Sequence, residues 1–424
     1  MSREIEYRTK NGVKIYAYKN TAQHGFYLSL FVKAGSMYES EDECGITHFF
    51  EHVAVRNVNA VRRGKLYAQL DRYGIDFNAS TYSEMVQFYV SGASENFSVG
   101  ASVITDLLSP LVLSVQEVDA ERGRIRAEIR ESDDKSSLVS FSSGIVFEET
   151  TLARQITGTA KSISRISRKK LEEYRKRILT RENIFFYVTG NFTDADIRGL
   201  SEMIERFKIT SGEARSNIAP VPKGFFDRPG TPHVKNADFT MARFTFDLDM
   251  SKITMPESDL LYDILLSGYN SDFFIELSER RGLFYDLTGA TERYKNIGTL
   301  AFSFEVKSGK LYEATEVIVE ILNSYKRRPL PENKCMKSSY VDNAYMLFDD
   351  FRELNFTFSY DNHIMELGYQ SIEERKRAYE SVTPERLLEV AAEVFKVKNL
   401  TLTVKGNKKT IDTERLAKII LGLR

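Results

Sequence analysis

Alternating hydrophobic and polar positions near the start of the chain predict a β-sheet. Residues 5–8 and 13–18 alternate on either side of an Asn11-Gly12 turn, which is typical of a β-hairpin. The apolar run at 26–34 predicts another strand, and 75–83 and 86–92 have the composition of two paired strands. A further strand is expected at 183–189, where the pattern ends at Gly190-Asn191.

Between these strands, apolar residues recur at the spacing of an α-helix. The pattern predicts helices from about residue 46, over 65–73, over 97–113 with an interruption at Pro110, and over 170–179. Residues 115–131 are expected to form a highly charged helix whose buried stripe is Val118, Ile125 and Ile129. Strands and helices mixed in this way indicate an α+β fold.

The second half of the chain repeats the first. Residues 166–191 and 382–407 correspond at a constant offset of 216 (406 − 190), which pairs Asn183 with Asn399 and Gly190 with Gly406. A strand at 300–306, a helix at 310–325 and a charged helix from about 331 correspond more loosely to the first half. We therefore expect two homologous α/β-sandwich domains, each an antiparallel-rich sheet packed with helices and related by internal duplication. Their expected limits are 1–212 and 233–424, with a Gly-, Pro-, Ser- and Asn-rich linker at 213–232.

The most specific motif is H-x-x-E-H, formed by His48, Glu51 and His52 inside an apolar segment. It holds two of the five histidines of the chain, and on a helix both imidazoles lie on one face. Two neutral imidazoles suit Zn²⁺, and a carboxylate that stays off the metal can accept a proton from water. The alternative is a buried helix whose histidines make ordinary core hydrogen bonds. At the offset of 216 the motif falls on residues 264–268, where we expect a helix without ligands.

The charged helix offers carboxylates that the two-histidine motif lacks. Glu121 and Glu128 are seven residues apart and therefore share one face. Taken alone, this helix is typical of a solvated surface with Glu–Arg pairs one turn apart. Taken with the motif, one of its carboxylates becomes a candidate third metal ligand.

Composition excludes several classes of partner. The formal charge of −1 over 424 residues does not favour nucleic acid or an anionic membrane surface. Cys44 and Cys335 are too far apart for a metal-type spacing or a disulfide framework. No apolar run approaches a membrane span, and the first residues lack the apolar core of a secretory signal, so a cytoplasmic protein is expected.

The motifs together resemble a known family. Residues 34–39 (Ala-Gly-Ser-Met-Tyr-Glu), 45–52, 78–81 and 121–129 resemble the M16 (pitrilysin/insulysin-like) metallopeptidases, and most closely the short two-domain M16B type that includes mitochondrial processing peptidase. The resemblance spans nearly the whole chain and implies half of a clamshell chamber with one Zn²⁺ per chain. It implies that His48, His52 and Glu128 bind zinc, that Glu51 activates water and that Glu121 orients a histidine ligand. It also implies that a peptide substrate adds as a strand beside Phe77, Asn78, Ala79 and Ser80.

One departure from the family bears on partners. The family carries an Arg and, seven residues later, a Tyr that bind substrate and steady the tetrahedral intermediate. Tyr285 matches that Tyr, but Ser278 stands where the Arg is expected. The resemblance implies a zinc endopeptidase that cleaves unfolded peptides as a homodimer or as a heterodimer with another M16B chain, which would supply the missing Arg. Two alternatives stay open, a heterodimer subunit dedicated to maturing a modified precursor peptide and a catalytically silent structural subunit. The intact H-x-x-E-H motif favours catalysis.

Overall fold

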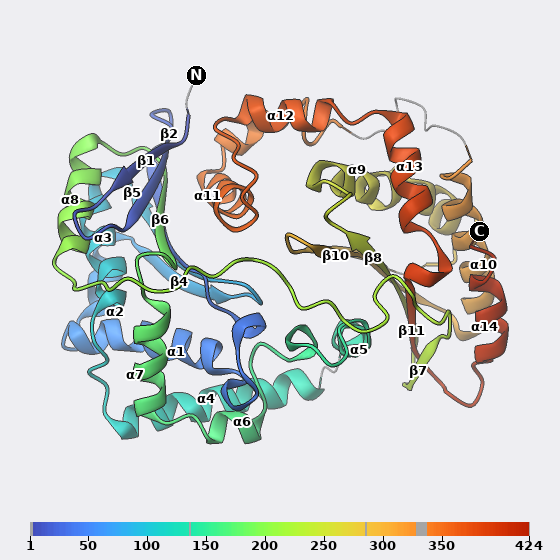
Figure 1. Cartoon of the computed structure of the whole chain (residues 1–424), viewed down its shortest axis with the longest axis horizontal. Helices are drawn as coiled ribbons and strands as arrows, with labels where there is room; N and C mark the ends of the chain where they lie inside the picture. The colour runs from blue at the N-terminus through green and yellow to red at the C-terminus, as the bar shows by residue number, and fades with distance from the viewer. Residues whose placement is uncertain (1–2, 135–136, 285, 328–336, 424) are drawn as a thin grey trace. The chain divides into compact units, whose positions relative to one another are not determined.

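The chain forms two compact units, each built on one β-sheet (Figure 1). The computed structural model describes residues 3–134, 137–284, 286–327 and 337–423. Unit 1 comprises Met1–Lys135, Arg154–Asn217 and Tyr345–Ile372, and unit 2 comprises Ser136–Ala153, Ile218–Ala344 and Glu373–Arg424.

Unit 1 contains a six-stranded sheet in the order β1-β2-β6-β3-β5-β4. The strands are β1 (Ile5–Arg8), β2 (Lys14–Lys19), β3 (Gly25–Val32), β4 (Asp76–Thr81), β5 (Val86–Ala93) and β6 (Ile184–Gly190). Among the described strands of this sheet, β2–β6 is the one parallel pair, so the sheet is antiparallel-rich as predicted. All seven residues of β6 are buried, because the central strands are covered on both faces. The edge strand β4 pairs with β5 alone among the described strands.

Helices pack on both faces of this sheet. The helices are α1 (Ile46–Val61), α2 (Leu66–Tyr73), α3 (Phe97–Thr105), α4 (Val115–Asp134), α6 (Ala160–Ser164), α7 (Arg168–Ile178), α8 (Asp194–Glu205) and α11 (Phe351–Ser359). The apolar stripe Val118, Ile125 and Ile129 of α4 is buried in the core, as expected. From the second half of the chain, α11 packs on β3 and β6 and buries Asn355, whose side chain donates to the carbonyls of Tyr27 and Tyr187.

Unit 2 repeats this architecture with a five-stranded sheet in the order β7-β11-β8-β10-β9. Its strands are β7 (His233–Asn236), β8 (Thr240–Asp249), β9 (Asp286–Arg293), β10 (Ile297–Val306) and β11 (Leu400–Gly406). Its helices are α5 (Leu138–Val146), α9 (Met255–Leu266), α10 (Leu311–Ser324), α12 (Ile372–Glu380), α13 (Pro384–Val394) and α14 (Thr413–Ile420). Among the described residues, no helix has both the length and the apolar character that a bilayer crossing requires.

The compact units differ from the domains expected at 1–212 and 233–424 in two exchanged segments. The helix α5 packs on β8 and β11 of unit 2, whereas α11 packs on β3 and β6 of unit 1. The expected domains were continuous stretches of sequence, whereas the compact units are defined by which segments pack together. The two divisions therefore differ at these two segments.

One local prediction was wrong. The helix expected over 97–113, with an interruption at Pro110, ends at Thr105 and is followed by a 3-10 turn (Asp106–Leu108), after which Ser109 is extended, as residues before proline prefer. The helix expected at 264–268 is present in part, because α9 covers 264–266, and these residues include no histidine. Of the charged helix expected from about 331, residues 331–336 lie outside the described residues and 338–343 form turns.

Candidate metal centre

The first turn of α1 is fixed by a buried carboxylate. The helix follows Gly45, whose φ of 85° is in the left-handed region that glycine adopts without strain. The two carboxylate oxygens of Glu39 accept hydrogen bonds from the backbone N–H groups of Gly45 and Thr47, at 2.8 and 2.9 Å. Acceptors with negative charge at a helix N-terminus satisfy its free N–H groups and complement its dipole. Burial raises the pKa of Glu39, and these hydrogen bonds offset part of that rise.

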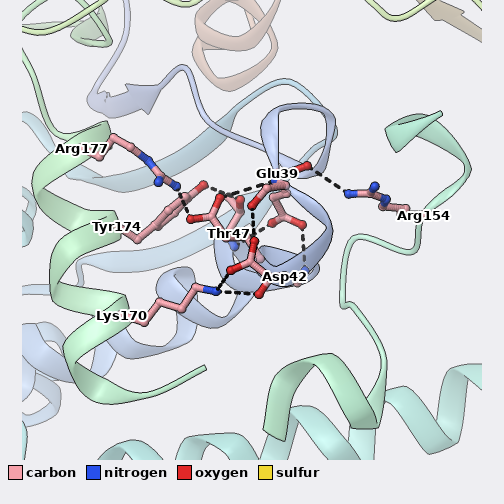
Figure 2. Close-up of polar contacts among 10 residues, drawn as sticks. Glu39, Asp42, Thr47, Arg154, Lys170, Tyr174 and Arg177 are labelled. Atoms are coloured by element: carbon pink, nitrogen blue, oxygen red, sulfur yellow. Dashed lines mark hydrogen bonds and ion pairs between the residues drawn. The ribbon is translucent and has the colours of Figure 1, made fainter. Parts of the chain in front are cut away.

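The loop before α1 is also tied to α7 and to Arg154 (Figure 2). The hydroxyls of Thr47 and Tyr174 lie 2.6 Å apart and are both buried. The other contacts are charged: Lys170 with Asp42 (2.6 Å), Arg177 with Glu43 (2.7 Å) and Arg154 with the carbonyl of Glu39 (3.0 Å). Contacts from α7 and from Arg154 therefore hold the residues that precede His48.

Three side chains with metal-ligating atoms meet between α1 and α4. The Nε2 atoms of His48 and His52 lie 3.5 and 3.6 Å from the two carboxylate oxygens of Glu128. One ligand atom from each residue lies within 4.8 Å of the others, and this is the one such group of three among the described residues. Two imidazoles and one carboxylate are a donor set of the kind that catalytic zinc sites use, with a fourth position left for water. The residues present therefore fit Zn²⁺.

The electrostatics of His48 keep its imidazole neutral. Burial, together with the neighbouring His52, lowers the pKa of His48 to about 4. At neutral pH its ring nitrogen thus has a lone pair available for a metal. The Nδ1 atom of His48 is buried and has no hydrogen-bond partner in the described part of the chain.

Glu51 lies beside this group without belonging to it. Its carboxylate accepts a hydrogen bond of 2.8 Å from the hydroxyl of Thr81, at the end of β4. Burial raises the pKa of Glu51 and Glu128 adds to that rise, whereas Thr81 and His52 act in the opposite direction. A carboxylate with a raised pKa, held in one orientation, is suited to accept and return a proton.

A cavity of about 440 Å³ opens beside His52. His52, Glu51 and Glu121 contribute to its wall, and Asn78 is the one residue of β4 that does so. Phe77 and Ala79 instead pack against the hydrophobic core, and Ser80 is half-buried. The strand predicted to receive substrate is thus an edge strand, and it reaches the cavity through Asn78.

Glu121 is buried behind His52. Its side chain is 2% exposed, and its Oε2 lies 3.7 Å from Nδ1 of His52. Its Oε1 contacts the guanidinium groups of Arg56 and Arg124. Sequence reasoning missed Arg56, although its position four residues after His52 places it on the same face of α1 and was the available signal.

The predicted Arg/Tyr site of the second domain is only partly described. Tyr285 lies outside the described residues. Ser278 is half-buried in the π-helical segment Phe274–Glu279. Arg280, the residue after this segment, is exposed and pairs with Glu276 within it.

The amino-acid sequence matches two family models. Residues 14–160 match the model described as insulinase (peptidase family M16), and residues 165–336 match the model described as peptidase M16 inactive domain. Together they span most of the chain. The chain therefore belongs to peptidase family M16, and the predicted family and fold class are confirmed.

Individual relatives are distant in sequence. An uncharacterized zinc protease of Rickettsia bellii is 25% identical over 327 residues, which are 76% of this chain and 77% of that protein. The beta subunit of the mitochondrial-processing peptidase of Rattus norvegicus is 29% identical over 167 residues, 39% of this chain and 34% of that protein. The structure of the periplasmic protease PqqL from Escherichia coli superposes with a TM-score of 0.81 at 18% identity, over 98% of this chain and 49% of that one. The last similarity shows the fold.

Proposed function

We propose that this protein is a zinc-dependent endopeptidase of the M16B type that cleaves unfolded peptides. The observation that carries the proposal is the convergence of His48, His52 and Glu128, with ligand atoms within 4.8 Å of one another. His48, His52 and Glu128 would bind one Zn²⁺ per chain. When bound, Zn²⁺ supplies a Lewis acid that polarises a carbonyl and makes water more acidic.

Glu51 and Glu121 would have separate roles in the hydrolysis. The Glu51 carboxylate takes the proton from the attacking water and later gives it to the leaving amine, which requires one group to act as base and then as acid. Its raised pKa and its hydrogen bond from Thr81 support both roles. Glu121 would orient His52 through the ring nitrogen that does not face the metal.

An extended peptide would bind beside β4. An edge strand offers unpaired backbone groups to which a peptide adds as a further strand, with little dependence on its side chains. The cavity of about 440 Å³ next to Asn78 accommodates side chains close to the scissile bond. Only a chain without its own tertiary structure presents such a segment, so we propose unfolded peptides or peptide precursors as substrates.

The active assembly is proposed to be a dimeric chamber. The beta subunit of mitochondrial-processing peptidase is by name one part of an assembly, and PqqL is about twice as long as the region that matches this chain. Both support pairing of two M16 halves, either as a homodimer or as a heterodimer with another M16B chain. The serine at position 278 favours the heterodimer, because a serine cannot offer the charged fork of donors that an arginine presents to a developing oxyanion.

A dedicated role in maturing a modified precursor peptide is the second candidate; Ser278 is compatible with it, because a subunit without the Arg would need a partner chain to supply one. A catalytically silent structural subunit is the third, and the preserved group of His48, His52 and Glu128 opposes it.

The test compares the wild-type chain with Glu51→Gln, each alone and co-expressed with an M16-like partner. We expect Glu51→Gln to retain about one zinc per chain and to lose cleavage of a fluorogenic unfolded peptide by roughly 10²–10⁴-fold, since it removes the general base. Cleavage only in the mixed dimer would support the heterodimer. A Glu51→Gln variant that cleaves as fast as wild type would rule out the mechanism.

A further inference from the structure

Arg56 connects the metal-binding helix to the carboxylate behind it. It lies on α1, one turn after His52, and its Nη1 is 2.5 Å from Oε1 of Glu121 on α4. Arg124 contacts the same oxygen at 2.9 Å. The second oxygen, Oε2, remains for Nδ1 of His52 at 3.7 Å. The four side chains thus form a connected polar group that begins on α1, crosses to α4 and returns to α1.

The burial of Glu121 makes this connection necessary. A carboxylate whose side chain is 2% exposed loses most of its hydration, and such a charge is tolerated when charged donors compensate it. Two guanidinium groups at Oε1 do so and fix the direction in which Oε2 points. At 3.7 Å, Oε2 lies beyond hydrogen-bonding distance of Nδ1 of His52, but its negative charge favours the His52 tautomer that carries its proton on that nitrogen, with Nε2 on the side of Glu128.

We propose that Arg56 is a positioning residue that sets the zinc affinity of the site through Glu121 and His52. This inference rests on the proposed function, because it assumes that His52 is a zinc ligand. The two histidines then differ in how they are supported: His52 faces Glu121, whereas Nδ1 of His48 has no acceptor among the described residues. Zinc binding at this site consequently depends on the orientation of one imidazole more than on that of the other.

Arg56 and Arg124 should contribute unequally to the zinc affinity of the site. The Arg56 side chain is 31% exposed and belongs to a different helix from Glu121, so it fixes α4 against α1. The Arg124 side chain is 69% exposed and lies three residues from Glu121 on the same helix. Solvent screens the more exposed charge, and a contact within one helix does not orient that helix against its neighbour. Arg124 is therefore a matched control that contacts the same oxygen.

We expect the geometry of the Arg56 side chain, as well as its charge, to affect the zinc affinity. A guanidinium is planar and directs several donors, whereas an ammonium group is a point charge on a flexible stem. Arg56→Lys should therefore restore only part of what Arg56→Gln removes. A role in charge compensation alone would make the lysine variant equal to wild type.

The experiment measures the dissociation constant for Zn²⁺ by competition with a chromophoric chelator, in the full chain. Loss of a residue that orients a metal ligand typically weakens binding by about 10–100-fold, and we expect Arg56→Gln to fall in this range. For Arg124→Gln we expect less than about a 3-fold change, and for Arg56→Lys an intermediate value. Circular dichroism of the zinc-free variants establishes that each is folded. If Arg56→Gln does not fold, Arg56→Lys provides the test instead. An Arg56→Lys variant whose dissociation constant for Zn²⁺ equals that of wild type would overturn the proposal.

Other outcomes separate this inference from the proposed function. Arg56 also lines the cavity of about 440 Å³, so it has access to bound substrate. If Arg56→Gln binds Zn²⁺ as wild type does but shows a higher KM for peptide, Arg56 contacts substrate and the inference fails while the zinc site stands. If the wild-type chain itself binds no Zn²⁺, the proposed function fails and the inference fails with it.

Discussion

The hydrogen bond between Thr47 and Tyr174 allows a quantitative test of how the first turn of α1 is held. The two hydroxyls are 2.6 Å apart and buried. Thr47→Val keeps the shape of the side chain and removes this bond. A neutral buried hydrogen bond contributes about 1 kcal/mol, and a buried hydroxyl left without its partner costs about 1–3 kcal/mol, so the free energy of opening α1 should fall by about 1–3 kcal/mol.

A double-mutant cycle isolates the part due to the pair. Tyr174→Phe should cost about 1 kcal/mol, and the double variant should cost about 1 kcal/mol less than the sum of the single variants, because the second substitution has no bond left to break. Tyr174 also contacts Arg215, and the cycle removes that contribution since Tyr174→Phe loses it in both backgrounds.

Hydrogen exchange of peptides that cover 46–61 in the zinc-free protein measures these local free energies. Thr105→Val is the matched control, because that buried hydroxyl donates to carbonyls of its own helix, those of Ala101 and Ser102, which the helix already satisfies. Exchange at 46–61 should not change in this control. Additive effects of Thr47→Val and Tyr174→Phe would refute the argument that this pair stabilises the start of α1.

Two further predictions concern the third ligand and a buried acid. Glu128→Gln should weaken Zn²⁺ binding by at least about 10-fold, measured by chelator competition, because it removes a proposed ligand; an unchanged constant would place the third ligand elsewhere. Burial, with a smaller effect of Asp259, raises the pKa of Asp263 in α9 from 3.8 to about 6. Since this folded-state pKa lies above the unfolded value, Asp263 stabilises the folded state below about pH 4, and that contribution is lost as the pH rises through about 6, by roughly 2–3 kcal/mol. Asp263→Asn should therefore raise the thermal midpoint relative to wild type at pH 8 and not at pH 4; equal gains at both pH values would contradict this sign.

Local patterns in the sequence predicted the elements of the fold well. The start of α1 at Ile46, the hairpin β1–β2 and the buried stripe of α4 follow from the periodicity of apolar residues, and the structure confirms them. The end of α3 at Thr105 was not predicted. Pro110 indicated a break, but Leu107 and Leu108 continue the apolar pattern of the helix beyond Thr105. Periodicity states which residues are buried, but not where the backbone stops being helical.

Contacts between distant segments could not be predicted in this way. Nothing in residues 351–359 indicates that Asn355 hydrogen-bonds the backbone of β3 and β6, more than 150 residues away in sequence. In the same way, the sequence does not indicate that Glu39 contacts the backbone of Thr47, because this contact depends on a turn at Gly45. The pairing of Arg56 with Glu121 joins two helices through residues that are 65 apart in sequence, and the only signal for it was the spacing of Arg56 from His52.

The most direct test of the central claim is X-ray absorption at the zinc edge of the purified chain, with metal content measured on the same sample. We predict about one zinc per chain with only nitrogen and oxygen ligands, two of them imidazoles, at distances of about 2.0–2.2 Å. The sample of Glu128→Gln should lose one oxygen ligand or the metal itself. A sulfur ligand near 2.3 Å, which Cys44 or Cys335 would have to supply, or a chain that takes up no zinc, would contradict the assignment of His48, His52 and Glu128 as the metal site.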